Sequence, residues 1–435
     1  MARTNTAPHA STLTTHQGGT AVLIRPKEDL LRACASTMLF ENTFYEGGDS
    51  VASRIAALVK ENTPERVSEV ASICREKLKL RHVPLWLAAQ MAIAFRGNPL
   101  VKQTVAAVIQ RPDEMAEMIS LYWKATGDER KATGHSRIPA QIKKGIAEAF
   151  CKFDEYRLAK WDRQDRAVKL KDVLFLTHPK PKDADQDALW KQLIAGTLAT
   201  PDTWEVALSA GADKKATWER LLSEHKLGGM ALLMNLRNMT EAKVGRSAIR
   251  AALAWIDGRS RLLPFRFVAA AKYAPEHADA LGDAMLRAVS GYGKLDGLTV
   301  LMVDCSGSMI GAPISAKSKL DRLDAASALA VLVREVCEDS RVLGWTNNVY
   351  ELPNLRGMAM LPAIRAVPNG GTYLAQCLTA VKAKIPDVDR IIVITDEQAH
   401  DGIIPSWGKQ KGYIVNVAPY APGLDASGQW QRING

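Results

Sequence analysis

The sequence predicts a multidomain protein, in which an all-α body of helical repeats is joined to an α/β doubly wound domain. Between residues 27 and 290, apolar side chains recur at helical spacing and strand-like alternation is scarce. After Gly291, short apolar runs alternate with helical stretches, a pattern typical of parallel sheets covered by helices. We therefore predict three parts: a flexible N-terminal tail (1–26), a helical-repeat body (27–290) and an α/β domain (295–435).

The helical body contains recognisable helix starts. Thr63, Pro64 and Glu65 supply an N-cap, a proline at the first helical position and an acid in the first turn. The following residues place one apolar face on this helix: Val67, Val70, Ala71, Cys74 and Leu78. Many helices joined by short loops predict stacked helix pairs, a HEAT-like solenoid.

The α/β domain is predicted from apolar runs that end at acidic residues. Residues 298–303 precede Asp304 and residues 390–395 precede Asp396, so both runs predict strands buried on both faces of a parallel sheet. The other predicted elements are helices at 321–338 and 373–384, a strand pair at 341–345 and 349–352, and a strand at 412–417.

Charge is distributed unevenly between these parts. The 435 residues carry a formal net charge of +10 and give a pI of about 9.2. Residues 296–435 contain 13 Lys and Arg against 14 Asp and Glu, so 44 basic and 33 acidic residues lie in 1–295. The excess positive charge on the helical body indicates a polyanionic partner such as RNA or DNA. A solvated basic surface without such a partner is the alternative.

The composition, with 47% hydrophobic and 24% charged residues, is ordinary for a globular protein. No apolar stretch approaches the roughly 20 residues that a membrane-spanning helix needs, so we expect no membrane partner. The N-terminus lacks a secretory signal, and the six cysteines include no CxxC pair. We therefore expect reduced cysteines and a cytoplasmic location.

The most basic segment, residues 137–182, contains twelve Lys and Arg and six acidic residues. Within it, cations recur at every third position: Arg157, Lys160, Arg163, Arg166 and Lys169. On one helix these side chains would form a slanted stripe that follows a phosphate backbone. Tyr156 and Trp161 lie between them and are candidates for stacking on exposed bases. An ordinary charged helix face, with nearby acids as partners, is the alternative interpretation.

Five oxygen-bearing residues lie at predicted strand ends and in a loop. Asp304, Ser306 and Ser308 form a D-x-S-x-S motif after the first apolar run, Asp396 follows the second, and Thr372 precedes a predicted helix. Ligand sites in open α/β sheets lie beyond the carboxyl ends of strands, so we expect these side chains to converge. Two carboxylates and three hydroxyls suit Mg²⁺, with Ca²⁺ or Mn²⁺ as alternatives, and are unsuited to zinc. Helix capping by the two serines is the interpretation without a metal.

A hydrolase with Ser306 or Ser308 as nucleophile and His400 as base is a further alternative. The motif lacks the first glycine of G-x-S-x-G, where Asp304 stands, and it lacks a second carboxylate at position 306 for a phosphatase. We expect His400 on a surface loop, because it lies four residues after Asp396. The sequence therefore predicts no catalytic residues and no enzyme.

The five oxygen-bearing side chains resemble the complete metal-ion-dependent adhesion site of von Willebrand A domains: Asp304, Ser306, Ser308, Thr372 and Asp396. This resemblance implies a von Willebrand A-like domain at 295–435. It also implies a divalent metal, expected to be Mg²⁺, that binds a ligand and performs no catalysis.

Segments of the helical body resemble the TROVE module. Residues 227–240 and 263–273 look like its helix signatures. Residues 42–45 resemble its early segment, and residues 174–180 resemble its RNA-contacting loop. A TROVE module followed by an A-type domain with the motif at 303–309 is the order found in the Ro autoantigen family and its bacterial relatives.

This resemblance implies a non-enzymatic protein that forms a ribonucleoprotein with small, structured Y-like RNA on a basic outer surface. The helical repeats would form a monomeric ring closed by the A-type domain, and the hole would take single-stranded 3′ ends of misfolded RNAs. An exoribonuclease such as polynucleotide phosphorylase is the implied partner in RNA quality control. By motif position, the resemblance implies RNA contacts at Lys160, His178 and Lys180. Arg137, Lys143 and Lys144 lie in a segment that is also basic in the family, and Arg163 and Arg166 complete the eight predicted RNA contacts. A metal-dependent protein-interaction scaffold that binds acidic partners, without specific RNA, is the alternative function.

Overall fold

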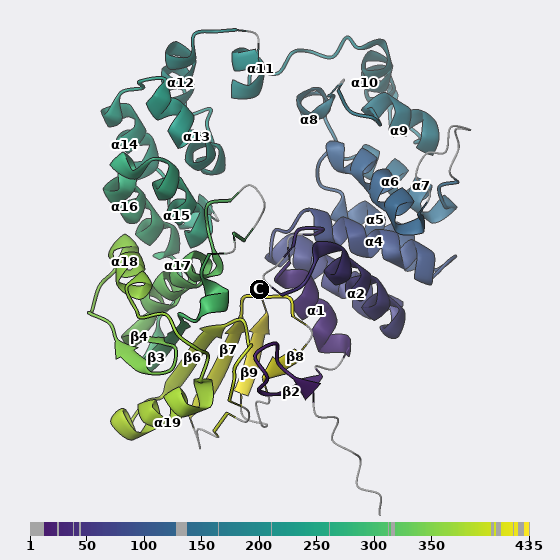
Figure 1. The fold of residues 1–435 in the computed structure, drawn as a ribbon. Helices are drawn as coiled ribbons and strands as arrows, with labels where there is room; N and C mark the ends of the chain where they lie inside the picture. Colours follow the sequence, from purple (N-terminus) through teal and green to yellow (C-terminus); the bar gives the residue numbers. More distant parts are fainter. Residues whose placement is uncertain are drawn as a thin grey trace, which may run out of the picture. The chain divides into compact units, whose positions relative to one another are not determined.

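The computed structural model describes residues 13–23, 26–37, 39–42, 45–127, 137–163, 165–209, 211–260, 262–311, 313–314, 318–401, 404–405, 410–420, 422–424 and 430–434. The chain forms two compact units (Figure 1). The helical unit combines residues 26–40 with 48–217, and the sheet unit combines the N-terminal stretch and residues 41–47 with 218–435. Each unit has its own hydrophobic core.

The helical unit consists of helices joined mostly by short loops. The predicted N-cap is confirmed, because Thr63 Oγ1 accepts a hydrogen bond from the backbone N of Arg66 at 3.3 Å. Its helices are α1 (Pro26–Ala35), α2 (Gly48–Glu61), α3 (Pro64–Ser72), α4 (His82–Ala94), α5 (Pro99–Val108), α6 (Asp113–Thr126), α7 (Ala140–Phe150), α8 (Glu155–Trp161), α9 (Leu170–Thr177), α10 (Ala184–Ala195) and α11 (Trp204–Ser209). The helix α12 (Lys214–Ser223) contains residues of both units.

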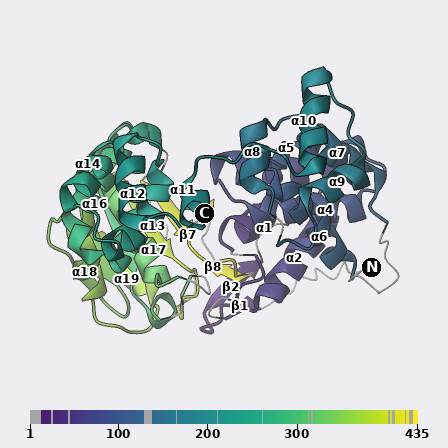
Figure 2. The ribbon, with the colours of Figure 1, turned by 90° about the horizontal axis from the view of Figure 1, so that it is seen from above.

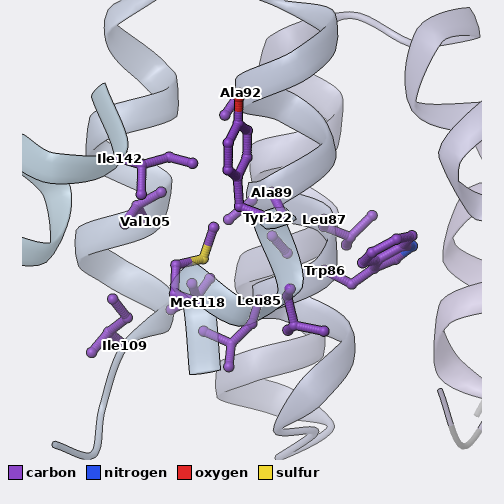
Figure 3. Packing of buried hydrophobic residues seen from close by; sticks show 14 of the residues in the cluster. Leu85, Trp86, Leu87, Ala89, Ala92, Val105, Ile109, Met118, Tyr122 and Ile142 are labelled. Atoms are coloured by element: carbon purple, nitrogen blue, oxygen red, sulfur yellow. The ribbon is translucent and has the colours of Figure 1, made fainter. Parts of the chain in front are cut away.

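The core of the helical unit is centred on α4, which is apolar on every side. Residues 83–92 of this helix are all buried. Figure 3 shows Val105 of α5, Met118 and Tyr122 of α6, and Ile142 of α7 gathered around it. A helix that is apolar all round is stable in water only when neighbours cover every face. The packing of α5, α6 and α7 onto α4 therefore fixes where the loops between them lie.

One buried ion pair connects two helical turns of this unit. Arg75, in a π-helical turn at Ile73–Lys77, donates to both carboxylate oxygens of the fully buried Glu114 at 2.7 and 2.6 Å. Glu114 Oε2 also accepts hydrogen bonds from the backbone N of Gln110 and Arg111 at 2.9 and 3.1 Å. The carboxylate thus satisfies the backbone donors of the loop before α6 and holds that loop in place.

The sheet unit contains a six-stranded sheet in the order β5-β4-β3-β6-β7-β9. All neighbouring pairs are parallel except β4 and β5. The predicted strand at 390–395 and the predicted strand pair at 341–345 and 349–352 are confirmed. The strands are β3 (Leu295–Asp304), β4 (Cys337–Trp345), β5 (Val349–Glu351), β6 (Arg390–Thr395), β7 (Lys411–Asn416) and β9 (Trp430–Asn434). The helices are α13 (Gly229–Glu241), α14 (Arg246–Ala254), α15 (Pro264–Tyr273), α16 (Ala278–Val289), α17 (Arg322–Glu335), α18 (Met360–Arg365) and α19 (Leu374–Lys384).

The central strand β3 is buried on both faces, as the apolar run predicts. Val300 and Met302 pack in one cluster with residues of α19. Leu301 and Val303 alternate with them and are also fully buried, on the opposite face. The result is a helix-rich fold with a mixed, mainly parallel sheet.

The prediction of a flexible tail at 1–26 is wrong for residues 13–23. These residues form β1 (Leu13–Thr14) and β2 (Thr20–Leu23), which pair antiparallel, and β2 pairs with β8 (Pro422–Leu424). Figures 1 and 2 both show β2 beside β8. A side chain at Gly19 would overlap the carbonyl oxygen of Ala399, so glycine permits this close approach. The short, polar tail sequence therefore gains its order from long-range strand pairing.

The helices between residues 218 and 290 belong to the same compact unit as the six-stranded sheet. Val268 of α15 packs against Leu320 and Ala328, and Lys272 contacts the carboxylate of Asp324 on α17. The compact units therefore divide at residue 217, whereas the sequence pattern changes at 290. The difference arises because a sequence pattern reports the kind of element and not what its apolar face packs against.

Among the described residues, no helix is long and apolar enough to cross a membrane.

Breaking the buried ion pair should destabilise the helical unit strongly. We expect Glu114→Ala to lower its free energy of unfolding by about 3–5 kcal/mol, because Arg75 would be left as a buried charge without its partner. Urea unfolding followed by circular dichroism measures this change. As a control, Lys191→Ala removes an exposed pair with Asp187 and should cost less than about 1 kcal/mol. Equal destabilisation by both variants would contradict this role for the pair.

Candidate functional site

Two acidic residues lie at the carboxyl ends of neighbouring parallel strands. Asp304 is the last residue of β3, and Asp396 directly follows β6. The strands pair in parallel, with Val303 opposite Ile394, so both side chains reach the same edge of the sheet. This edge is where ligands bind in open α/β sheets. The predicted convergence of the two carboxylates is confirmed.

The carboxylate of Asp304 is held by the strand ends around it. Its Oδ1 accepts from the backbone N of Ser306 at 2.9 Å, and its Oδ2 accepts from Thr395 Oγ1 at 2.6 Å. Ser306 Oγ lies 3.4 Å from Ser308 Oγ. All of these side chains are buried. The two serines therefore join the carboxylate in a closed, oxygen-lined cluster.

Asp396 completes this cluster and retains an unused acceptor. Its Oδ1 accepts from the backbone N of Gln398 at 3.1 Å, and its side chain contacts Ser308. The other oxygen, Oδ2, is buried and has no hydrogen-bond partner among the described residues. A buried carboxylate oxygen without a donor costs free energy unless a proton or cation satisfies it. The donor set of two carboxylates and two serine hydroxyls is one that Mg²⁺ accepts, so these residues fit a divalent cation.

The electrostatics of the two carboxylates support the same fit. Burial, together with the negative charge of Asp396, raises the pKa of Asp304 to about 7. Burial also raises the pKa of Asp396, although contacts with Ser308 and Gln398 oppose the shift. Two buried acids close together repel each other when both are ionised. A bound cation would remove this repulsion.

Thr372 lies in a loop on the approach to α19 and is buried. Its backbone N donates to His400 Nδ1 at 3.1 Å, and its carbonyl accepts from the backbone N of His400 at 2.7 Å. A side chain at Gly307 would lie 3.8 Å from Asn369 Oδ1 of the same loop, which places the loop beside the serine motif. The structure thus brings Asp304, both serines and Asp396 into contact and sets the Thr372 loop next to them.

His400 is engaged with the backbone and with a neighbouring ring. Its Nδ1 accepts from Thr372, and its ring stacks on Tyr373 with centroids 5.0 Å apart. Among the described residues it makes no hydrogen bond to Ser306 or Ser308, so the serine–histidine arrangement of a hydrolase is not formed. His400 is half-buried and docked on a loop, whereas the sequence predicts a surface position.

Sequence reasoning missed an aromatic group at this cluster. The hydroxyl of Tyr45 contacts Ser308, and Gln17 Nε2 donates to the same hydroxyl. The Tyr45 ring stacks on His16 with centroids 4.7 Å apart and meets the buried Tyr420 edge-on at 5.2 Å. Burial raises the pKa of Tyr45. No local pattern marks Tyr45, because only the tertiary fold carries residues 41–47 to the sheet edge.

The described residues contain no group of three or more His, Cys, Asp or Glu side chains arranged to hold a metal. The candidate cluster therefore depends on hydroxyls in addition to its two carboxylates. With only two negative charges, a divalent cation there would not be over-neutralised and would stay attractive to an anionic ligand.

A second candidate site is the cationic surface of the helical unit, which we define as the eight residues predicted to contact RNA. Arg137 precedes α7, which carries Lys143 and Lys144. Lys160 lies on α8, and the remaining four residues lie in loops or at the end of α9: Arg163, Arg166, His178 and Lys180. His178 adopts a left-handed backbone conformation with φ of 48°, which is uncommon for a residue other than glycine. The loop with Lys180 lies against the end of α7, because the Lys180 carbonyl accepts from Cys151 Sγ at 3.7 Å.

The predicted helical stripe of cations is wrong. The helix α8 ends at Trp161, so Arg163 and Arg166 lie in the following loop and not on the same helix as Lys160. The next helix, α9, begins only at Leu170, where Asp172 accepts from the backbone N of Lys169 in a capping arrangement. The three-residue spacing of the cations therefore crosses a helix end that periodicity does not reveal.

Most of the cationic surface carries uncompensated charge. Arg163 is the exception, because its Nε and Nη2 donate to Asp165 at 3.0 and 2.7 Å. The other seven residues form no ion pair with any carboxylate among the described residues. Six of the eight are exposed, and Lys143 and Lys160 are half-buried. Unpaired cations on a surface are the form in which a protein meets phosphate groups.

The fold and these sites define a class of protein: a helix-rich chain with a mixed sheet, an unpaired cationic surface on its helices and a buried carboxylate–hydroxyl cluster at the sheet edge. Residues 23–197 and 182–290 match the TROVE domain. The chain therefore belongs to the TROVE domain family, whose members are known for RNA binding.

Known proteins are similar to this chain in fold or over part of their sequence. The crystal structure of the Deinococcus radiodurans RO (RSR) protein aligns with a TM-score of 0.60 at 19% sequence identity, covering 94% of this chain and 97% of that chain. The likeness shows that the two share a fold. Telomerase protein component 1 of Mus musculus is 23% identical over 301 residues, and that of Rattus norvegicus is 22% identical over 288 residues. These matches cover 50% and 47% of this chain but only 11% of the length of either relative.

Removing one charge of the buried carboxylate pair should stabilise the fold of the metal-free protein at higher pH. An acid whose pKa is higher in the folded than in the unfolded state makes the fold less stable as pH rises between the two values. For Asp304 these values are about 3.9 unfolded and about 7 folded. We therefore expect the Tm of Asp304→Asn minus the Tm of the unsubstituted protein, both measured in EDTA, to increase between pH 5 and pH 8.

Differential scanning calorimetry measures this difference. Asp387→Asn makes the same chemical change at an exposed position of the sheet unit and should give a difference that does not vary with pH. A constant or falling difference for Asp304→Asn would show that burial and the charge of Asp396 do not raise the pKa of Asp304 in the fold.

Proposed function

We propose that this chain is a non-catalytic RNA-binding protein whose helical unit binds RNA through its cationic surface. The observation that carries the proposal is that seven of the eight predicted contact residues are cationic or protonatable and have no carboxylate partner among the described residues. They lie within the residues that match the TROVE domain. A family fold and a surface of uncompensated charge thus coincide on the same helices.

Physical chemistry favours folded RNA as the ligand of this surface. The deep, narrow major groove of an RNA helix excludes side chains, so proteins recognise such helices by shape, phosphates and 2′-hydroxyls. Separate cations on α7, α8 and the loop after α9 can each meet a phosphate without entering a groove. We therefore propose a small, structured, Y-like noncoding RNA as the partner.

The resemblance to the Ro autoantigen family extends the proposal to RNA processing. Single-stranded 3′ ends of misfolded RNAs are the second proposed ligand, and an exoribonuclease such as polynucleotide phosphorylase is the proposed protein partner. Membership of the TROVE domain family, whose members are known for RNA binding, supports an RNA ligand of some kind. The proposed location is the cytoplasm.

We also propose that the cluster at the sheet edge is a metal-ion-dependent adhesion site in a von Willebrand A-like domain. Asp304, Ser306, Ser308 and Asp396 would hold Mg²⁺, with Thr372 contributing from the adjacent loop. The unsatisfied Oδ2 of Asp396 and the repulsion between the two acids support this proposal. A bound cation would supply a positive charge for a carboxylate or phosphate oxygen of a partner.

Reversing the charge of the cationic surface should weaken RNA binding. We expect Lys144→Glu combined with Lys180→Glu to weaken the binding of a small folded RNA by at least about tenfold, because two phosphate contacts become repulsive. The slope of log Kd against log salt concentration should fall by roughly one for each lost contact. Fluorescence anisotropy over a salt series measures both quantities.

The control is a double variant with the same charge change, Lys102→Glu with Lys191→Glu. Both of these lysines are already paired, with Glu148 and Asp187 at 2.7 Å. Equal losses in the two double variants would exclude a specific surface. If the unsubstituted protein bound acidic proteins and no RNA, the protein-interaction scaffold would be the correct function.

Magnesium should stabilise the sheet unit through the two acids. We expect millimolar Mg²⁺ to raise the Tm of the EDTA-treated protein, and Asp396→Asn to abolish the increase, because one of two charged ligands is lost. Differential scanning fluorimetry with and without Mg²⁺ measures the increase. Asp387→Asn should retain it, and an increase that survives Asp396→Asn would exclude this site.

A further inference from the structure

A groove in the helical unit lies beside the cationic surface and is separate from its eight residues. It has a volume of about 480 Å³ and is lined by the loop before α6, the loop after α7 and one side of α8. Its size lies within the range of about 300–1,000 Å³ that is usual for small-molecule sites. The side chains that matter for its chemistry are Arg111, Lys152, Phe153, Arg157 and Trp161.

The groove is lined by three basic side chains and by no acidic one. Lys152 donates through Nζ to the carbonyl oxygens of Ala106 and Ile109, the latter at 3.2 Å. Among the described residues it has no carboxylate within ion-pair distance. Burial lowers the pKa of Lys152. Two of its three Nζ hydrogens are used by these carbonyls, so one remains for a further acceptor. An anion in the groove would accept this remaining hydrogen bond.

Arg157 adds a second weakly compensated charge. Its Nε lies 4.0 Å from Asp154 Oδ2, and both side chains are more than half exposed. An exposed pair at that distance contributes little and leaves the guanidinium available to a stronger anion. Lys152 and Arg157 therefore offer two cations to one ligand.

Arg111 and Trp161 form a preorganised flat surface in the same groove. The guanidinium of Arg111 lies over the Trp161 ring, 3.6 Å from its centroid. Its Nε and Nη2 donate to Asp113 at 3.1 and 2.8 Å, and its backbone N is held by Glu114. Nη1 makes no hydrogen bond among the described residues. Planar guanidinium and indole groups held in this way are surfaces on which nucleic-acid bases stack.

We propose that this groove binds one nucleotide of a single-stranded RNA, with its phosphate at Lys152 and Arg157 and its base against the Arg111–Trp161 stack. A phosphate ion alone would leave the stacked surface and the buried Phe153 unused, and a carboxylate would use them no better. A base within a duplex is already stacked on its neighbours, so the ligand must be unpaired. The inference rests on the proposed RNA-binding function and adds to it a site that stacks with one base of the RNA.

Crosslinking the full-length protein to a short RNA tests the inference locally. The probe is a single-stranded decanucleotide that contains 4-thiouridine, and mass spectrometry identifies the crosslinked peptide. We expect a crosslink within residues 152–161, and we expect adenosine monophosphate to reduce it at concentrations where inorganic phosphate has no effect. Equal competition by phosphate would overturn the nucleotide assignment and leave an anion site only.

Variants separate the base contact from the phosphate contact. We expect Trp161→Leu and Arg157→Gln each to weaken the crosslink by about tenfold, whereas Trp161→Phe, which keeps a stacking surface, stays within about twofold. Lys191→Gln, with the same loss of charge at an exposed position, should have no effect. The Arg157 side chain is exposed, so Arg157→Gln should fold normally. It therefore tests the phosphate contact even if Trp161→Leu fails to fold.

The outcome also distinguishes this inference from the proposed function. If Trp161→Leu and Arg157→Gln bound folded RNA normally and kept an unchanged crosslink, the groove would not be a nucleotide site. The proposed binding of folded RNA would stand. If the unsubstituted protein bound neither the folded RNA nor the decanucleotide, the proposed function would fail as well.

Discussion

The parallel pairing of β3 with β6 is the constraint on which the sheet-edge site depends. It places Asp304 and Asp396 at one edge and buries both carboxylates completely. The backbone around them is arranged to donate to these acids, with Ser306 N on one and Gln398 N on the other. A fold that buries two acids side by side gives up stability unless a proton or cation accompanies them. The same pairing therefore creates both the electrostatic cost and the pair of carboxylates that we propose to bind a cation.

In the helical unit, the buried carboxylate and the surface cations differ in whether they have partners. Its buried carboxylate at Glu114 is paired, since it accepts from Arg75 and from two backbone amides. The eight residues of its cationic surface are mostly without an ion pair among the described residues, and several of them lie at helix ends and in loops. Cations at such positions contribute little to folding, so their presence without partners is better explained by a polyanionic ligand.

The loop before α6 connects these two roles. Glu114 accepts a hydrogen bond from the backbone N of Arg111. The guanidinium of Arg111 donates to Asp113 and lies over the ring of Trp161. An interaction that stabilises the core thereby also fixes the orientation of a guanidinium in the groove. Trp161, which sequence reasoning assigns to base stacking, has one face already covered by Arg111. Its contribution to binding is therefore shared with that arginine.

The sequence by itself determined the kinds of element and the two acidic residues that meet at the sheet edge. Apolar runs that end at Asp304 and Asp396 fix two buried strands, because a run buried on both faces has no other stable place in a sheet. The capping pattern at Thr63 likewise fixes a helix start, because cap and helix are neighbours in the chain. Only the tertiary structure decided that α8 stops at Trp161, that residues 13–23 form strands, and that Tyr45 reaches Ser308. These features depend on contacts between residues far apart in the chain, which local periodicity and spacing do not encode.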